Sequence, residues 1–284
     1  MKLAFDIGGT AIRRAIIKDR EIIALDNFPT KGMELKSRLE ALIGETVSAR
    51  RIEFVGVSFA GQVTNGTILS APNIDPARLK NISFPDWIKE RFGLPAAIDN
   101  DLKCAALAEV SARECRNLFA LFIGTGIGGA YIEDKKLLRG AKNLAGEIGH
   151  IPFEKAPFPC GCGKDNCLEL SASGSAVARW GDLYLLNKNR LSDMLSADDD
   201  RSKEIVNRFM RGVTYAVETV AALLNPEIII LGGGVALNNP QVLRWAKNAL
   251  KTAFRPAADI VIEQSSLGDP ANLLGAAGLS QATP

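Results

Sequence analysis

The distribution of apolar positions at the start of the chain predicts three strands. Residues 2–7, 11–18 and 21–28 are rich in apolar side chains, and only short turns separate them. A parallel pair needs a crossover of a dozen or more residues, so turns this short indicate an antiparallel meander. Residues 34–48 have apolar side chains at helical spacing, and the largely apolar segment 54–59 predicts a buried strand.

Turn and cap residues locate the next elements. The Asn65-Gly66 pair predicts a hairpin within residues 61–69. Gly93 ends a helix predicted over residues 85–92, because glycine readily adopts the left-handed conformation at a helix end. A strand predicted over residues 95–100 leads into a helix whose first residue is Asp101.

The pattern of the first residues restarts near residue 115. Residues 118–139 follow the order strand, glycine–threonine turn, strand, as residues 1–23 do. This weak internal repeat predicts an α/β protein of two similar halves that face each other across a cleft. The second half is further predicted to contain helices over 172–186, 202–224 and 240–253, strands over 227–234 and 259–264, and a terminal helix over 272–282.

Composition and charge narrow the class of protein. The chain has 284 residues, of which 47% are hydrophobic and 23% charged, which is typical of a soluble globular protein of about two domains. A net charge of +2 gives no electrostatic reason to expect nucleic acid or a membrane as partner. With no signal-peptide pattern or transmembrane-length apolar run, we expect a cytoplasmic protein.

Cysteine and histidine are concentrated in one segment. His150 is the only histidine, and three of the five cysteines, Cys160, Cys162 and Cys167, follow within seventeen residues of it. Three thiolates and one imidazole form a standard donor set for structural zinc. The alternative, free thiols in a flexible loop, is disfavoured because dense thiols usually have a ligand. A redox Cys-x-x-Cys spacing is absent, and Asn166 is expected to supply a left-handed turn.

Two carboxylates flank this cluster. Glu147 precedes His150 by three residues, and Glu169 follows Cys167 by two. Carboxylates held on a rigid loop can accept hydrogen bonds from the hydroxyls of a polyol. They are equally consistent with charges on surface turns, and their spacing alone leaves both interpretations open.

Three glycine-rich segments, 6–10, 123–129 and 231–236, each follow a predicted strand. Glycines there let backbone amides approach a phosphate closely, and the Asp6 carboxylate is suited to Mg²⁺ held through water. None has the P-loop spacing, and a strand follows Gly126–Gly129 where a dinucleotide fingerprint requires a helix. Three such turns favour phosphate binding.

Asp99, Asn100 and Asp101 lie where a predicted strand passes into a helix. A carboxylate there is suited to accept the proton of an attacking hydroxyl in phosphoryl transfer. The alternative is that Asp99 or Asp101 only caps the helix. Because a cap needs one such residue, the pair favours a functional role.

In order and sequence, these motifs resemble the ROK family of sugar kinases and repressors, within the actin/hexokinase/Hsp70 superfamily. The resemblance extends over essentially the whole chain through DIGGT, IGTGIGG, LGGGVA and GAAGL, and most specifically through GEIGH with CGCGKDNCLE. It implies a two-domain actin-like ATPase (ribonuclease H-like) fold with a cleft. The domains expected are 1–115, with the terminal helix 271–284 packing back on it, and 116–270, which carries a zinc loop at 150–167.

The resemblance also implies ATP-dependent phosphorylation of a hexose by a homodimer that uses Mg²⁺ and structural Zn²⁺. Asp101 is the implied general base. The residues implied to bind sugar are Gly61, Asn73, Asn100, Asp101, Glu147, His150 and Glu169. Those implied to bind ATP and Mg²⁺ are Asp6, Gly8, Gly9, Thr10, Thr125, Gly126, Gly232 and Gly233. His150 would then contact zinc through one ring nitrogen and sugar through the other.

Two departures from the family pattern concern the substrate and the activity. Ala11 stands where the family commonly has lysine, with Arg13 and Arg14 as candidate substitutes, and SFAGQV lacks a Pro-Gly common in the family's glucose kinases. Glucose is the favoured substrate, with N-acetylmannosamine or another N-acetylhexosamine as the alternative. A non-catalytic sugar sensor is less favoured. A repressor is not expected, because the first phosphate motif begins at Asp6 and leaves no room for a DNA-binding domain before it.

Overall fold

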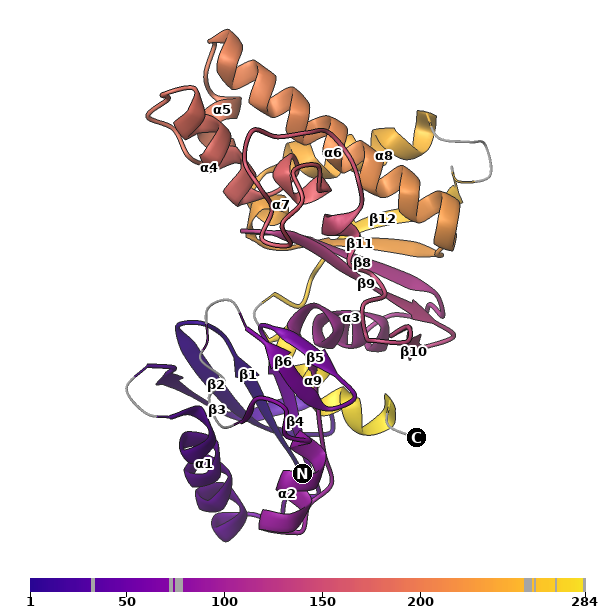
Figure 1. The fold of residues 1–284 in the computed structure, drawn as a ribbon. Coiled ribbons are helices and arrows are strands. Elements are labelled where there is room, and N and C mark those ends of the chain that lie inside the picture. Colours follow the sequence, from indigo (N-terminus) through magenta and orange to yellow (C-terminus); the bar gives the residue numbers. More distant parts are fainter. Residues whose placement is uncertain are drawn as a thin grey trace. The chain divides into compact units, whose positions relative to one another are not determined.

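The computed structural model describes residues 1–31, 34–71, 74, 79–252, 257, 259–268 and 270–282 (Figure 1). The chain divides into two compact units. The first consists of Met1–Glu114, Lys135–Ala145 and Leu267–Pro284, and the second of Cys115–Asp134 and Gly146–Ser266. The segment 135–145 therefore belongs to the first unit, whereas the sequence predicts it within the second domain, 116–270.

The first unit is built on a five-stranded sheet of order β3-β2-β1-β4-β7. Its strands are β1 (Lys2–Ile7), β2 (Ala11–Lys18), β3 (Glu21–Pro29), β4 (Phe54–Phe59) and β7 (Ala96–Asn100). β1, β2 and β3 pair antiparallel, which confirms the predicted meander. β1, β4 and β7 pair in parallel, so their carboxyl ends meet at one edge of the sheet.

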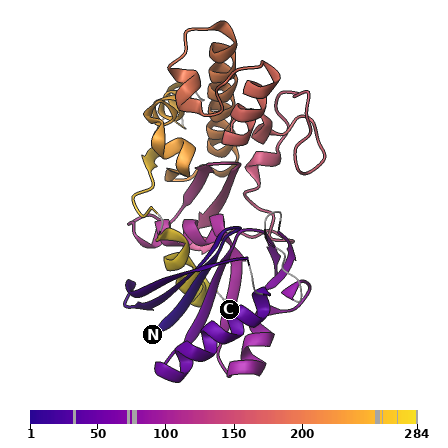
Figure 2. The same cartoon turned by 90° about the vertical axis from the view of Figure 1, so that its left-hand side faces the viewer.

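Helices pack on both faces of this sheet (Figures 1 and 2). α1 (Leu35–Ala49) and α2 (Phe84–Phe92) contribute apolar side chains to one core, and Gly93 ends α2 with φ +70° as predicted. α3 (Asp101–Ser111) and α9 (Ala271–Ala282) pack together on the other face. The approach is close, because a Cβ on Gly275 would lie 1.7 Å from the carbonyl oxygen of Cys104. A small hairpin, β5 (Gln62–Thr64) and β6 (Thr67–Ser70), also belongs to this unit.

The second unit repeats the plan around a sheet of order β10-β9-β8-β11-β12. The strands are β8 (Leu118–Ile123), β9 (Ile127–Glu133), β11 (Ile228–Gly232) and β12 (Val261–Gln264), with β10 (Lys136–Leu137), whose residues are assigned to the first unit, as the edge strand of the sheet. β8 and β9 form an antiparallel hairpin, whereas β8, β11 and β12 run parallel. This order of strands around a glycine turn matches β1, β2 and β4 of the first unit, as the internal repeat predicted.

Helices of the second unit form its core with this sheet. They are α4 (Gly174–Leu183), α5 (Leu191–Leu195), α6 (Asp200–Leu224), α7 (Gly234–Asn238) and α8 (Pro240–Thr252), together with the 3₁₀ turns η2 (Ile148–His150) and η3 (Leu168–Leu170). The apolar pattern of the sequence predicts α4, α6 and α8, but it does not predict α5, α7, β10 or the 3₁₀ turns. Elements of two to five residues are too short for an apolar period to emerge. None of the helices in the described part of the chain is long and apolar enough to cross a membrane.

Candidate functional site

The carboxyl ends of three parallel strands bring polar side chains into one row. Asp6 of β1 stands opposite Ser58 of β4, and Ser58 stands opposite Asp99 of β7. Parallel neighbours lie about 4.8 Å apart. The side chains of Asp6, Ser58 and Asp99 are all buried, so each needs a hydrogen-bond or ion-pair partner within the protein. The carboxyl edge of an open α/β sheet is a common place for a ligand site.

Asp6 is held by three side chains. Arg13 of β2 donates two hydrogen bonds to Oδ2, at 3.0 Å from Nε and 2.5 Å from Nη2. Oδ1 accepts from Ser58 Oγ at 2.8 Å and from Asn272 Nδ2 at 3.2 Å. Carboxylate oxygens are the donors that Mg²⁺ prefers, so Asp6 fits such a role, but it would share Oδ2 with Arg13. No local pattern indicates that Asn272, 266 residues away, contacts Asp6.

The turn after Asp6 is pinned by hydrogen bonds. The Gly8 amide donates to the Ala11 carbonyl at 2.9 Å, and Thr30 Oγ1 donates to the Gly8 carbonyl at 2.7 Å. Gly8 and Gly9 are half-buried, and Thr10 is exposed at the tip. A fixed turn of small residues presents backbone amides without the cost of ordering them.

Asn100, and neither aspartate beside it, is the N-cap of α3. Its Oδ1 accepts from the Leu102 amide at 3.0 Å, while its Nδ2 donates to the Gly61 carbonyl at 3.2 Å. The alternative that Asp99 or Asp101 merely caps the helix is therefore wrong. Asp101 is the first residue of α3 and is half-buried, and its Oδ1 lies 2.9 Å from the Leu102 amide. Asn100 uses both ends of its amide within the protein.

A buried network surrounds Asp99. Its Oδ2 accepts from Arg139 Nε at 3.0 Å, and its Oδ1 accepts from Asn143 Nδ2 at 2.8 Å. Asn143 also donates to the Val63 carbonyl at 2.7 Å and accepts from the ammonium of Lys103, which is 1% exposed. The network fixes segment 139–145 against the end of β7. Sequence reasoning missed all three of its partners, since no motif marks them.

Of the two remaining sugar-binding candidates of the first unit, Gly61 and Asn73, the structure describes only Gly61. Gly61 lies where a Cβ would be 2.5 Å from the Ser70 carbonyl oxygen, so only glycine fits there without a shift. Its backbone is tied to Asn100 as described above. Asn73 lies outside the described residues.

In the second unit, the turn between β8 and β9 contacts the start of α4. The amides of Gly174 and Ser175 donate to the carbonyls of Gly124 and Thr125 at 2.8 and 2.9 Å. Ser173 caps α4, and its Oγ donates to the Glu169 carbonyl at 2.7 Å. The glycine turn and the loop that carries Glu169 are thereby locked together.

Glu169 lies against this turn. A Cβ on Gly126 would be 2.6 Å from Glu169 Oε2, and the same oxygen accepts from the Ile127 amide at 3.4 Å. Its other oxygen lies 3.6 Å from Cys160 Sγ. Glu169 therefore links two of the predicted motifs, the glycine turn and the cysteine loop, and it is half-buried rather than a free surface charge.

Gly232 and Gly233 have a packing reason to be glycine. A Cβ on Gly232 would lie 2.4 Å from the Phe122 ring, and one on Gly233 would lie 2.5 Å from the Ile123 carbonyl oxygen. Gly233 also has φ +86°, which side chains rarely tolerate. Close packing of β11 on β8 thus explains both residues without a ligand, and their role in nucleotide binding stays a prediction.

The segment 146–150 is fixed on β9. A Cβ on Gly149 would lie 2.2 Å from the Ile127 carbonyl oxygen, and one on Gly146, with φ +91°, would lie 2.5 Å from the Gly129 carbonyl oxygen. The His150 amide donates to the Glu147 carbonyl at 3.1 Å. The side chain of Glu147 is exposed and that of His150 is half-buried.

The cysteine loop gathers the four predicted ligands. One donor atom from each of His150, Cys160, Cys162 and Cys167 lies within 4.8 Å of the other three. Cys160 Sγ is 3.6 Å from His150 Nδ1, and the sulfurs of Cys162 and Cys167 are 3.3 Å apart. With Zn–S near 2.3 Å and Zn–N near 2.0 Å, a tetrahedral ion needs separations of about 3.5–3.8 Å. The donor set fits a zinc ion, and the Cys160–His150 separation lies within this range, whereas the Cys162–Cys167 separation is slightly shorter.

Backbone hydrogen bonds shape this loop. The Cys160 amide donates to the Lys164 carbonyl at 2.7 Å, and the Gly163 amide donates back to the Cys160 carbonyl at 2.9 Å. Gly163, with φ +91°, supplies the left-handed residue, so the expectation for Asn166 is wrong. Burial and the neighbouring thiols Cys162 and Cys160 raise the pKa of Cys167 to about 12. A bound cation would offset that penalty by stabilising the thiolates.

Comparison with known proteins agrees with this geometry. A ROK family glucokinase from Streptomyces griseus, solved in complex with glucose and AMPPNP, is similar with a TM-score of 0.74, at 26% identity and 99% coverage of both chains. The fold is therefore the two-domain actin-like ATPase fold of these kinases, as expected. The model of the ROK family matches residues 2–283, and the chain belongs to the ROK family.

Two curated relatives are sugar kinases of different specificity. A glucokinase from Streptomyces coelicolor is 29% identical over 315 residues, covering 99% of this chain and 98% of the relative. An N-acetylmannosamine kinase from Yersinia pseudotuberculosis is 31% identical over 291 residues, covering 97% and 96%. Such similar identities leave the sugar unresolved.

Proposed function

We propose that this protein is an ATP-dependent kinase that phosphorylates a hydroxyl of a hexose. The observation that carries the proposal is the position of Asp101 as the first residue of α3, half-buried directly after the parallel strand β7. A half-buried carboxylate at the carboxyl edge of a parallel sheet can accept a hydroxyl proton as phosphoryl transfer proceeds. Asp101 is therefore the proposed general base.

The nucleotide is proposed to bind at the glycine turns. Gly9 and Thr10 supply backbone amides in the first unit, beside Gly8, whose own amide donates to the Ala11 carbonyl, and Thr125 and Gly126 supply them in the second. Bound Mg²⁺ would neutralise charge on the phosphates, with Asp6 as its carboxylate partner through water. Arg13, which already pairs with Asp6, is proposed to compensate for Ala11 where relatives commonly carry lysine.

The sugar is proposed to bind through Glu147, His150 and Glu169 in the second unit and through Asn100 in the first. His150 Nδ1 lies 3.6 Å from Cys160 Sγ, which supports this nitrogen as the proposed zinc ligand and Nε2 as the proposed donor to a sugar hydroxyl. Zinc at the cysteine loop would hold the imidazole and Glu169 in one orientation. Glucose is the favoured hexose, and N-acetylmannosamine or another N-acetylhexosamine is the alternative.

The test is ADP release from Mg-ATP by the purified protein with glucose, mannose, fructose, glucosamine, N-acetylglucosamine and N-acetylmannosamine. Asp101→Asn should lower kcat by roughly 10²–10⁴-fold with the best sugar. Asp86→Asn is the matched control, because Asp86 also lies in the first turn of a helix of the same unit and is exposed. Sugar binding without turnover in zinc-replete, folded protein would favour a sensor instead.

A further inference from the structure

Two hairpin turns of the chain share an unusual composition. Asp19-Arg20 connects β2 to β3, and Asp134-Lys135 connects β9 to β10. All four residues have positive φ, from 47° to 70°. Two-residue turns of this kind favour glycine at the second position, because a side chain there is strained. Both turns instead place a basic residue at that position.

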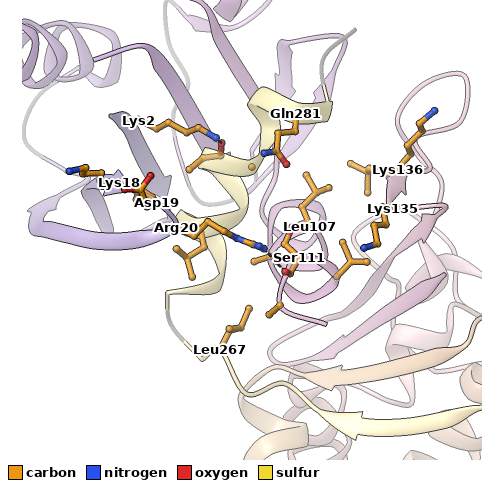
Figure 3. Close-up of a pocket in the computed structure, with 18 of the residues that line it drawn as sticks. Lys2, Lys18, Asp19, Arg20, Leu107, Ser111, Lys135, Lys136, Leu267 and Gln281 are labelled. Carbon is orange, nitrogen blue, oxygen red and sulfur yellow. Dashed lines mark hydrogen bonds between the residues drawn. The ribbon is translucent and has the colours of Figure 1, made fainter. Parts of the chain in front are cut away.

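Arg20 and Lys135 line the same pocket, which has a volume of about 1230 Å³. All of its lining residues belong to the first unit. Six lining side chains are basic and two, Asp19 and Glu53, are acidic. In Figure 3, Lys2, Arg20 and Lys135 extend toward the middle of the pocket, whereas Lys18 and Lys136 extend away from it.

The cations at this pocket are only partly neutralised. Lys2 Nζ donates to the Ala277 carbonyl at 3.1 Å and to Ser280 Oγ at 2.7 Å, and Arg20 donates to the Ser111 carbonyl. These acceptors are neutral. Burial and the charge of Arg20 lower the pKa of Lys2, and Glu53, which opposes this shift, is also 3.3 Å from the Met1 amino group. An anion would relieve this repulsion.

Apolar side chains form another part of the pocket wall. Leu107 and Val110 of α3 and Leu274 of α9 line it beside the basic residues. A pocket of this volume is much larger than a bare inorganic ion needs, and it exceeds the roughly 300–1,000 Å³ of typical small-molecule sites. The mixture of charge and apolar surface suits a ligand with one anionic group and an organic body.

We propose that this pocket binds a phosphorylated small molecule, with its phosphate between Arg20, Lys2 and Lys135. The pocket is separate from the glycine turns, because Lys2 begins β1 and Asp6 lies four residues on, about 13 Å along the strand. Its lining residues Ala112, Lys135 and Leu267 adjoin three of the points where the chain passes between the units. The proposal does not depend on the sugar kinase activity.

The test measures binding to the full chain by isothermal titration calorimetry at constant ionic strength. The probes are inorganic phosphate, glucose 6-phosphate and phenyl phosphate. The key variant is Arg20→Gly with Lys135→Gly, which removes both cations and places glycine where the turns favour it, so folding should be preserved. The charge-matched control is Arg51→Gln with Lys89→Gln, at two exposed positions of the same unit outside the pocket.

We expect saturable binding of an organic phosphate, weakened at least about tenfold in the glycine variant and unchanged in the control, since each lost charge-assisted bond is worth about a factor of ten or more. Absence of binding to the unsubstituted chain would overturn the proposal. Unchanged affinity in the variant with both glycine substitutions would also overturn it, because the anion would then bind at the glycine turns. Equal weakening of binding in this variant and in the control would overturn it as well. Inorganic phosphate binding more tightly than both esters would overturn the assignment of an organic ligand.

Discussion

Replacing Cys162 with serine tests the coupling between the cysteine loop and sugar binding. Cys162 is the exposed member of the four-residue cluster, with its sulfur 3.3 Å from that of Cys167. Its side chain contributes little to the core, so the substitution removes a proposed zinc ligand without creating a cavity. We expect loss of zinc together with weaker binding of the sugar.

The size of the effect follows from the donor set. The free energy of binding of a structural zinc ion is roughly 10–16 kcal/mol, which corresponds to about 3 kcal/mol for each of four ligands. Loss of one ligand should therefore weaken zinc binding by roughly 100-fold or more. Serine at an exposed position should alter the metal-free stability by no more than about 0.5 kcal/mol. The Michaelis constant for sugar should rise about 10–100-fold, as when residues that orient a site are lost.

The assay compares zinc content after dialysis against a chelator, by mass spectrometry, with the Michaelis constants for sugar and for ATP. Gly161→Ala is the matched control, because it is the adjacent residue and a Cβ there meets no atom within 4 Å. Retention of one zinc per chain in Cys162→Ser would exclude this thiol as a necessary ligand. Loss of zinc with an unchanged Michaelis constant for sugar would refute the proposed orientation of His150 and Glu169.

Three further predictions concern stability, each measured by urea denaturation. Gly149→Ala should cost about 1–3 kcal/mol because its Cβ would lie 2.2 Å from a backbone oxygen, whereas Gly161→Ala should be neutral. Arg13→Ala should cost about 1–3 kcal/mol by depriving the buried Asp6 of its cation, and Arg14→Ala, whose partners Asp26 and Glu45 are exposed, should cost less. Glu154→Gln should cost about 0.2–1 kcal/mol at pH 7. Arg211 lowers the pKa of Glu154 below 4.5, so this difference should shrink as the pH falls below that value, and a constant difference would contradict the assignment.

Local patterns in the sequence predicted most of the elements and one complete cluster. The three strands of residues 2–28, the helix ended by Gly93 and the repeat of the strand–turn–strand plan depend on neighbouring residues, which the chain places together whatever the tertiary fold. The cysteine loop was predictable for the same reason. Its three thiols lie within eight residues, so no long-range packing is needed to gather them.

One-residue choices at element ends were less predictable. Asn100 rather than Asp99 or Asp101 caps α3, and Gly163 rather than Asn166 takes the left-handed conformation in the cysteine loop. Adjacent residues of similar chemistry compete for such positions. At Asn100 the preceding strand β7 fixes which residue caps the helix, and the difference in free energy between such neighbouring candidates is too small to be recognised in the sequence.

Only the tertiary structure decided the partners of the buried polar groups. Arg13, Ser58 and Asn272 meet at Asp6, and Arg139 and Asn143 meet at Asp99, across separations of up to 266 residues. Strand register and the packing of α9 on the sheet bring these groups together, and neither is encoded in a local pattern. The sequence by itself determined which kinds of side chain are available for the chemistry. The packing of the first unit decided which charged side chains pair with other protein groups and which can bind a ligand. A charged group removed from water needs a partner of one kind or the other.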